Sequence, residues 1–141
     1  MKSVIPVLVC SIFVLLSLWH VRMAFGGMAG ESAAVPSVNG KPIFVPSRRS
    51  TLFVALLLLL FAALVAATAA VRLGIPAAVL SWLSHALAAG LLARAIGEFR
   101  YVGFFKRIRG TRFAVLDTMV YSPLCLLLAA GVAAVASRHG I

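Results

Sequence analysis

The sequence predicts an all-α fold, a four-helix bundle embedded in a membrane. Of the 141 residues, 63% are hydrophobic and 11% are charged, whereas soluble domains ordinarily contain about 45–50% and about 25%. A soluble globule of this size cannot cover so much apolar surface, but a membrane protein exposes that surface to lipid. Four separate apolar runs are each long enough to cross a bilayer. We therefore expect one membrane domain over residues 1–141.

The four apolar runs are separated by two polar loops and one short turn. The runs are Val4–Phe25, Leu52–Val71, Pro76–Ile96 and Thr118–Ala136. Between the second and third, Gly74 ends one helix and Pro76 begins the next, which predicts a tight antiparallel pair. The fourth helix is expected to extend back over the polar stretch 111–117 and to bend or begin at Ser122–Pro123.

The first run has an alternative interpretation as a cleaved signal peptide. Lys2 precedes the run, and "GESAA" supplies small residues for a cleavage site. The run is long for that role, and Trp19, His20 and Arg22 are unusual within a signal peptide. We therefore expect a retained membrane span.

Small residues on three spans predict close helix contacts. They are Ala62, Ala66 and Ala70, then Ala86, Gly90 and Ala93, then Ala129, Ala130, Gly131 and Ala133. His85 lies among such residues and is interpreted as a packed, hydrogen-bonded core histidine. Cys10 and Cys125 lie in apolar runs, outside any CxxC or Cys/His cluster, and at different depths. No metal, cofactor or disulfide is therefore predicted.

The distribution of basic residues predicts the orientation in the membrane. The face with the first and third loops carries eight: Lys41, Arg48, Arg49, Arg100, Lys106, Arg107, Arg109 and Arg112. The opposite face carries Lys2, Arg72 and Arg138. Basic loops are retained in the cytoplasm, so both termini are expected to be extracytoplasmic. The richness in Arg, Ala and Gly is typical of a GC-rich bacterial genome, and we expect a multi-pass protein of the bacterial cytoplasmic (inner) membrane.

The third loop mixes basic and aromatic residues in the segment "GEFRYVGFFKRIRGTRFAVLD". Such a pattern occurs in nucleic-acid-binding surfaces and in segments that lie on lipid. No base-stacking module surrounds it, and the neighbouring spans place it at the membrane surface, so nucleic acid is not the expected partner. Its cations are predicted to meet anionic headgroups, at about 1 kcal/mol for each basic residue near the surface. These are Arg100, Lys106, Arg107, Arg109 and Arg112.

Polar residues at the cytoplasmic ends of the spans form the candidate site. Ionisable groups within spans usually face the protein interior or an aqueous cavity. The predicted polar cluster contains His20, Arg94, Glu98, Asp117 and Tyr121. An Asn39–Gly40 turn predicts a small, irregular hairpin in the first loop, which would cover the cluster. The alternative is a structural salt-bridge cluster that neutralises arginines at the mouth of the bundle.

Four short segments of the sequence resemble those of a known family. They are "HVRMAFGG", "AVPSVNGKPIFVPS", "RAIGEFRYVGFFKRIRGTRFAVLDT" and "YSPLCLLLA". The chain resembles, over nearly its whole length, the uncharacterised family DUF3995 of small bacterial four-span membrane proteins. The resemblance implies a retained first span and a stand-alone membrane protein, and it implies no activity. The family pattern has Trp where this chain has Met23.

Three functions are compatible with these features. We favour non-catalytic binding of a partner, lipid or small ligand at the cytoplasmic face, with membrane lipids, another protein or a second copy as partners. The alternative is a membrane-embedded enzyme acting on a lipid-like substrate, with His20 and Asp117 or Glu98 as acid and base. The chain has no recognised catalytic spacing or phosphate-binding loop. A transporter is disfavoured because no midplane acid, inverted repeat or broken helix is present.

Overall fold

The computed structural model describes residues 4–26, 35–39, 41–43, 46–70, 74–97 and 101–139. Within these ranges four helical stretches are long and apolar enough to cross a membrane, which confirms the predicted all-α, four-span class. The elements are α1 (Val4–Phe25), β1 (Ser37–Val38), β2 (Lys41–Pro42), α3 (Arg48–Ala70), α4 (Ala77–Ile96), α5 (Arg112–Leu116), the π-helical turn η1 (Asp117–Tyr121) and α6 (Ser122–His139).

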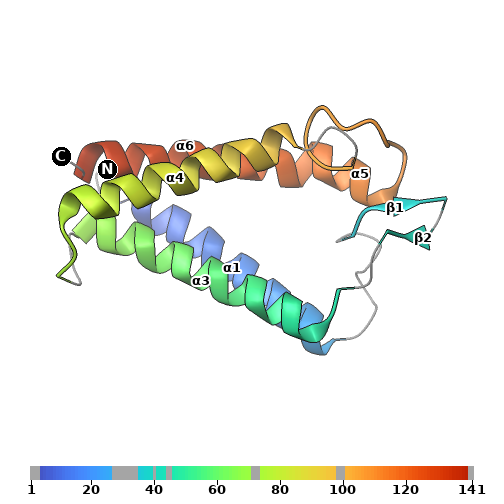
Figure 1. The fold of residues 1–141 in the computed structure, drawn as a ribbon, viewed down its shortest axis with the longest axis horizontal. Helices are drawn as coiled ribbons and strands as arrows, with labels where there is room; N and C mark the ends of the chain where they lie inside the picture. Colours follow the sequence, from blue (N-terminus) through green and yellow to red (C-terminus); the bar gives the residue numbers. More distant parts are fainter. Residues whose placement is uncertain are drawn as a thin grey trace.

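The helices are arranged as two antiparallel pairs (Figure 1). Helix α1 packs along α3, and α4 packs along α6. The pairs approach each other near the α3–α4 connection and diverge toward the end with β1, β2 and α5 (Figure 1). We call that wider end the loop face. The described parts of the first and third loops lie at this end (Figure 1). A four-span topology requires both loops to be on the same side.

Local capping explains where the helices begin. Helix α3 starts at Arg48, before the apolar run, because the Ser47 hydroxyl accepts a hydrogen bond from the backbone N–H of Ser50 at 3.1 Å. The Thr111 hydroxyl caps α5 in the same way, accepting from the N–H of Ala114 at 3.0 Å. The fourth span therefore begins at Arg112. This start lies within the polar stretch 111–117, over which the fourth helix was expected to extend.

The expected irregularity at Ser122–Pro123 takes the form of a π-helical turn. Proline has no N–H to donate to the preceding turn. Immediately before it, the N–H of Ser122 donates to the carbonyl of Asp117, five residues back. This wider ring lets the helix continue through Pro123, and it places Asp117 at the first position of the turn.

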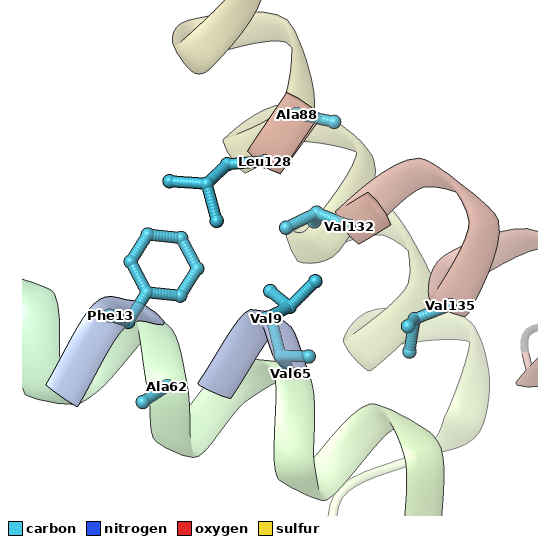
Figure 2. Packing of buried hydrophobic residues seen from close by; sticks show 8 residues of the cluster. All are labelled: Val9, Phe13, Ala62, Val65, Ala88, Leu128, Val132 and Val135. Carbon is cyan, nitrogen blue, oxygen red and sulfur yellow. The ribbon is translucent and has the colours of Figure 1, made fainter. Parts of the chain in front are cut away.

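The apolar core joins the two helix pairs (Figure 2). It contains Val9, Phe13, Ala62, Val65, Ala88, Leu128, Val132 and Val135. The rings of Phe13 and Phe61 meet edge to face with centroids 5.8 Å apart. Buried hydrogen bonds add to this packing, because the Thr68 and Ser84 hydroxyls of α3 and α4 lie 2.8 Å apart.

Part of the prediction from small residues is wrong. Ala62 and Ala129 are buried and Gly131 and Ala133 are half-buried. The exposed ones are Ala66 and Ala70 on α3, Ala86, Gly90 and Ala93 on α4, and Ala130 on α6. Helix α4 instead buries the face containing Leu80, Ser84, Ala88 and Ala95, where a serine pairs with the α3 threonine. The sequence pattern of small residues did not distinguish this face from the exposed one.

The other residues interpreted from the sequence have definite places. Cys10 and Cys125 are free thiols, both partly buried. His85 is hydrogen-bonded, its Nδ1 donating to the Ser81 carbonyl at 2.8 Å, but it is exposed rather than packed in the core. In the first loop β1 pairs with β2 in an antiparallel hairpin, with Asn39 at φ 53°. The predicted hairpin is thus present.

Candidate functional site

Asp117 is the centre of a buried ionic network at the loop face. Its side chain is 0% exposed. Oδ1 accepts a hydrogen bond from Arg94 Nη2 at 2.9 Å, and Oδ2 accepts from Lys106 Nζ at 3.1 Å. The backbone N–H of Gly103 also donates to Oδ2, at 2.6 Å. One carboxylate therefore joins α4, the third loop and the fourth span.

Lys106 is a buried member of this network, with 2% of its surface exposed. Besides Asp117, its ammonium group donates to the carbonyl of Gly103 at 2.9 Å and to the hydroxyl of Thr118. The ammonium group thus satisfies its three donors within the protein. The prediction that Lys106 lies on the lipid surface is corrected, because its charge is needed to neutralise a carboxylate that has no contact with solvent.

Two glycines make this loop conformation accessible to the chain. Gly97 and Gly103 have φ values of 91° and 89°. A Cβ on Gly97 would lie 1.8 Å from the carbonyl oxygen of Val102, and a Cβ on Gly103 would lie 2.3 Å from that of Ile96. The backbone therefore crosses itself at the end of α4. The crossing aims the Gly103 N–H at Asp117.

A cavity of about 400 Å³ lies between the helix pairs at the loop face. Its walls come from α1, the first loop, α3, α5 and η1. The lining residues are Leu16, Trp19, His20, Met23, Val35, Pro46, Ser50, Thr51, Val54, Phe113 and Tyr121. Most of these side chains are apolar or aromatic, and the polar ones are uncharged hydroxyls and one imidazole. The volume lies within the range of about 300–1,000 Å³ that is typical of small-molecule sites.

His20 lines this cavity, and one of its ring nitrogens is hydrogen-bonded within its own helix. Its Nδ1 lies 2.7 Å from the carbonyl oxygen of Leu16. A carbonyl only accepts, so Nδ1 carries the hydrogen, and Nε2 is the ring nitrogen that this bond leaves available. On another wall the rings of Phe113 and Tyr121 contact each other, with centroids 5.8 Å apart.

The predicted polar cluster is divided between two neighbouring sites. His20 and Tyr121 line the cavity, whereas Arg94 and Asp117 form the ionic network together with Lys106. Glu98 and Arg100 lie outside the described residues. The remaining loop cations Arg107, Arg109 and Arg112 are exposed. Arg109 also donates to the carbonyls of Lys106 and Phe104, at 3.2 and 2.9 Å.

Sequence reasoning missed most of the cavity wall. Trp19, Thr51, Val54 and Phe113 were not among the predicted site residues. One signal for them existed, because Leu16, Trp19, His20 and Met23 have the spacing of a single helix face. Met23 is part of this face.

Asp117 and His20, the predicted acid–base pair, have separate hydrogen-bond partners. The oxygens of Asp117 accept bonds from Arg94, Lys106 and Gly103, while His20 is oriented by its own helix. Among the described residues no group of three or more His, Cys, Asp or Glu side chains is placed to hold a metal ion.

Comparison with known proteins identifies the family. The family described as Protein of unknown function (DUF3995) matches residues 13–132. Neither the curated proteins nor the solved structures that were searched contain a match. The matched segment includes both the cavity and the ionic network, and it covers well over half of the chain. The chain therefore belongs to the DUF3995 family of proteins of unknown function.

Proposed function

We propose that this protein binds a membrane-dissolved amphiphile, without transforming it, in the cavity at its cytoplasmic face. The observation that carries the proposal is the cavity itself, which is largely apolar, has the volume of a ligand site and lies between two helix pairs. His20 and a few hydroxyl groups supply polar contacts for a headgroup, and the apolar walls supply contacts for a tail.

Access from the bilayer supports a membrane ligand. Trp19 and Val54 line the cavity and are 48% and 38% exposed, and both belong to helices that are long and apolar enough to cross a membrane. In our proposal an apolar tail enters the cavity from the lipid that surrounds these helices. A strictly water-soluble ligand would gain little from such walls.

Exposed arginines at the loop face would hold the surrounding anionic headgroups. Arg22, Arg49, Arg107 and Arg112 are exposed at this end. We propose that they contact lipid on the cytoplasmic side of the bacterial inner membrane, where such cations contribute about 1 kcal/mol each. Arg94 and Lys106 have a different role, because Asp117 binds both.

Filling the cavity is expected to remove the bound amphiphile. In Val54→Trp the indole would occupy space next to Thr51 and Tyr121, so a specific ligand would be displaced. Phe53→Trp is the matched control, since Phe53 is the neighbouring residue, is 60% exposed and does not line the cavity. Mass spectrometry of small molecules that co-purify in mild detergent should find a species with wild type and Phe53→Trp that Val54→Trp has lost. Identical profiles for all three proteins would refute the proposal.

The enzyme alternative gains no support from the contacts of the two key residues. It requires an acid close to His20, and the carboxylate of Asp117 is bound to two cations and a backbone N–H instead. Glu98, the other acid considered, lies outside the described residues.

The proposed orientation makes a separate prediction. If the loop face is cytoplasmic, alkaline phosphatase fused after residue 141 should be active, because this reporter folds only outside the cytoplasm. Green fluorescent protein at the same position should stay dark when exported by the same route. The reverse pattern would place the loop face, and the cavity with it, outside the cytoplasm.

A further inference from the structure

We infer that the amphiphile is a membrane quinone or its quinol, a ligand with an uncharged, planar ring and an apolar tail. This inference rests on the proposed function and adds the chemical class of the ligand. Three properties of the cavity support it: the absence of Lys, Arg, Asp and Glu from its described lining, the aromatic rings contributed by separate helices, and one imidazole whose Nδ1 is already hydrogen-bonded.

The lining contains no Lys, Arg, Asp or Glu among the residues that the structure describes. Several cations at this end are already bound within the protein. Arg94 and Lys106 bind Asp117, while Arg48 donates to the Ala24 carbonyl at 3.1 Å and lies over the Phe25 ring. An anionic phosphate inside the cavity would lose its hydration and find at most one counter-charge in the lining, a protonated His20. An uncharged headgroup avoids this loss.

Aromatic groups line the cavity from both sides. Trp19 and His20 belong to α1, whereas Phe113 belongs to α5 and Tyr121 to η1. Flat rings pack favourably against aromatic side chains in stacked or edge-on arrangements. A quinoid ring presents two flat faces to such walls, while a branched or tetrahedral headgroup presents none.

His20 suits the oxygen atoms of both redox forms. Because Nδ1 donates to the Leu16 carbonyl, Nε2 accepts a hydrogen bond from a quinol hydroxyl when the imidazole is neutral. When the imidazole is protonated, Nε2 donates to a quinone carbonyl. The inference concerns binding of either form and involves no electron transfer.

The two tryptophans of the chain provide the test and its control. Trp19 lines the cavity, whereas Trp82 lies on α4 and is 74% exposed. Quinones quench indole fluorescence on contact. Trp82→Phe, which keeps Trp19, and Trp19→Phe, which keeps Trp82, would each be placed in phosphatidylcholine nanodiscs and titrated with a benzoquinone that carries a short alkyl tail.

The expected result is saturable quenching of Trp19 and a merely linear, partition-driven decrease for Trp82. His20→Ala in the Trp82→Phe background should raise the Kd of the saturable phase roughly five- to tenfold, as expected for one lost hydrogen bond. The anaerobically reduced form of the same compound should compete with the quinone.

Two other outcomes would overturn the inference in different ways. If the quinone gives no saturable quenching, but phosphatidylglycerol co-purifies with wild type and is lost from Val54→Trp, the ligand is a phospholipid and the proposed function survives. If the quinone gives no saturable quenching and Val54→Trp loses no co-purifying species, the inference and the proposed function both fail.

Discussion

Replacing either Gly97 or Gly103 with alanine is expected to lower the free energy of unfolding by about 2–5 kcal/mol. A left-handed backbone conformation costs a non-glycine residue about 1–2 kcal/mol, and relieving a severe steric overlap costs about 1–3 kcal/mol more. The overlap here involves backbone, since the Gly97 Cβ would lie 1.8 Å from the Val102 carbonyl oxygen. Backbone cannot rotate away as a flexible side chain can.

Two other glycines separate the cost of the backbone conformation from the cost of the steric overlap. Gly110 has φ 90°, but a Cβ added there would have no other atom within 4 Å, so Gly110→Ala should lose only about 1–2 kcal/mol. Gly90 lies within α4 with similar open space, so Gly90→Ala should be stabilising by about 0.5–1 kcal/mol.

Thermal unfolding in detergent can be followed with a thiol-reactive fluorogenic dye. Cys10 and Cys125 are partly buried free thiols in two different helices, and they become reactive when the bundle opens. From most to least stable, the predicted order is Gly90→Ala, wild type and Gly110→Ala. The two least stable proteins are Gly97→Ala and Gly103→Ala. If Gly97→Ala and Gly110→Ala unfold at the same temperature, the close backbone crossing is absent.

Removing the charge of Asp117 is expected to have an effect of similar size. Asp117→Asn keeps the shape of the side chain but leaves Arg94 and Lys106 without a counter-charge. Breaking a buried ion pair on one side typically costs about 3–5 kcal/mol. Lys106→Met should also be destabilising, because Oδ2 of Asp117 and the Thr118 hydroxyl lose their shared donor.

The double variant Asp117→Asn, Lys106→Met distinguishes the ionic network from general core damage. If the two groups interact, its loss of stability should be smaller than the sum of the single losses, by about 0.5–3 kcal/mol. Arg107→Met is the control for removing a cation from the same loop. Its side chain is exposed, so the change should stay within about 0.5 kcal/mol. Additive effects, or an equal loss for Arg107→Met, would argue against the network.

The ionic network explains why the third loop contains both basic residues and glycines. Its basic composition first suggests a surface that binds anions, and its exposed arginines retain that role in the proposal. Lys106 is the one lysine in this loop, and the crossing of Gly97 and Gly103 turns the loop so that it faces Asp117. The sequence pattern did not show that this cation is buried while Arg107 is exposed.

The candidate site was partly predictable for a similar reason. Asp117, Arg94, His20 and Tyr121 could be selected because polar groups at membrane depth need partners. Which partner each one has depends on the rotation of the helices about their axes. A hydropathy pattern does not determine that rotation when a span is apolar all round, and the exposed side of α4 that contains Ala86 and Gly90 is the clearest example.

The sequence by itself determined the number of spans, their order, the first-loop hairpin and the extension of the fourth helix over the polar stretch before Thr118. These features follow from apolar length and turn residues, whereas the Thr111 cap that fixes the helix start was found in the structure. Only the tertiary structure decided that the polar residues divide between a cavity and an ionic network. That division depends on how far the two helix pairs diverge, and packing between segments distant in the chain sets this distance.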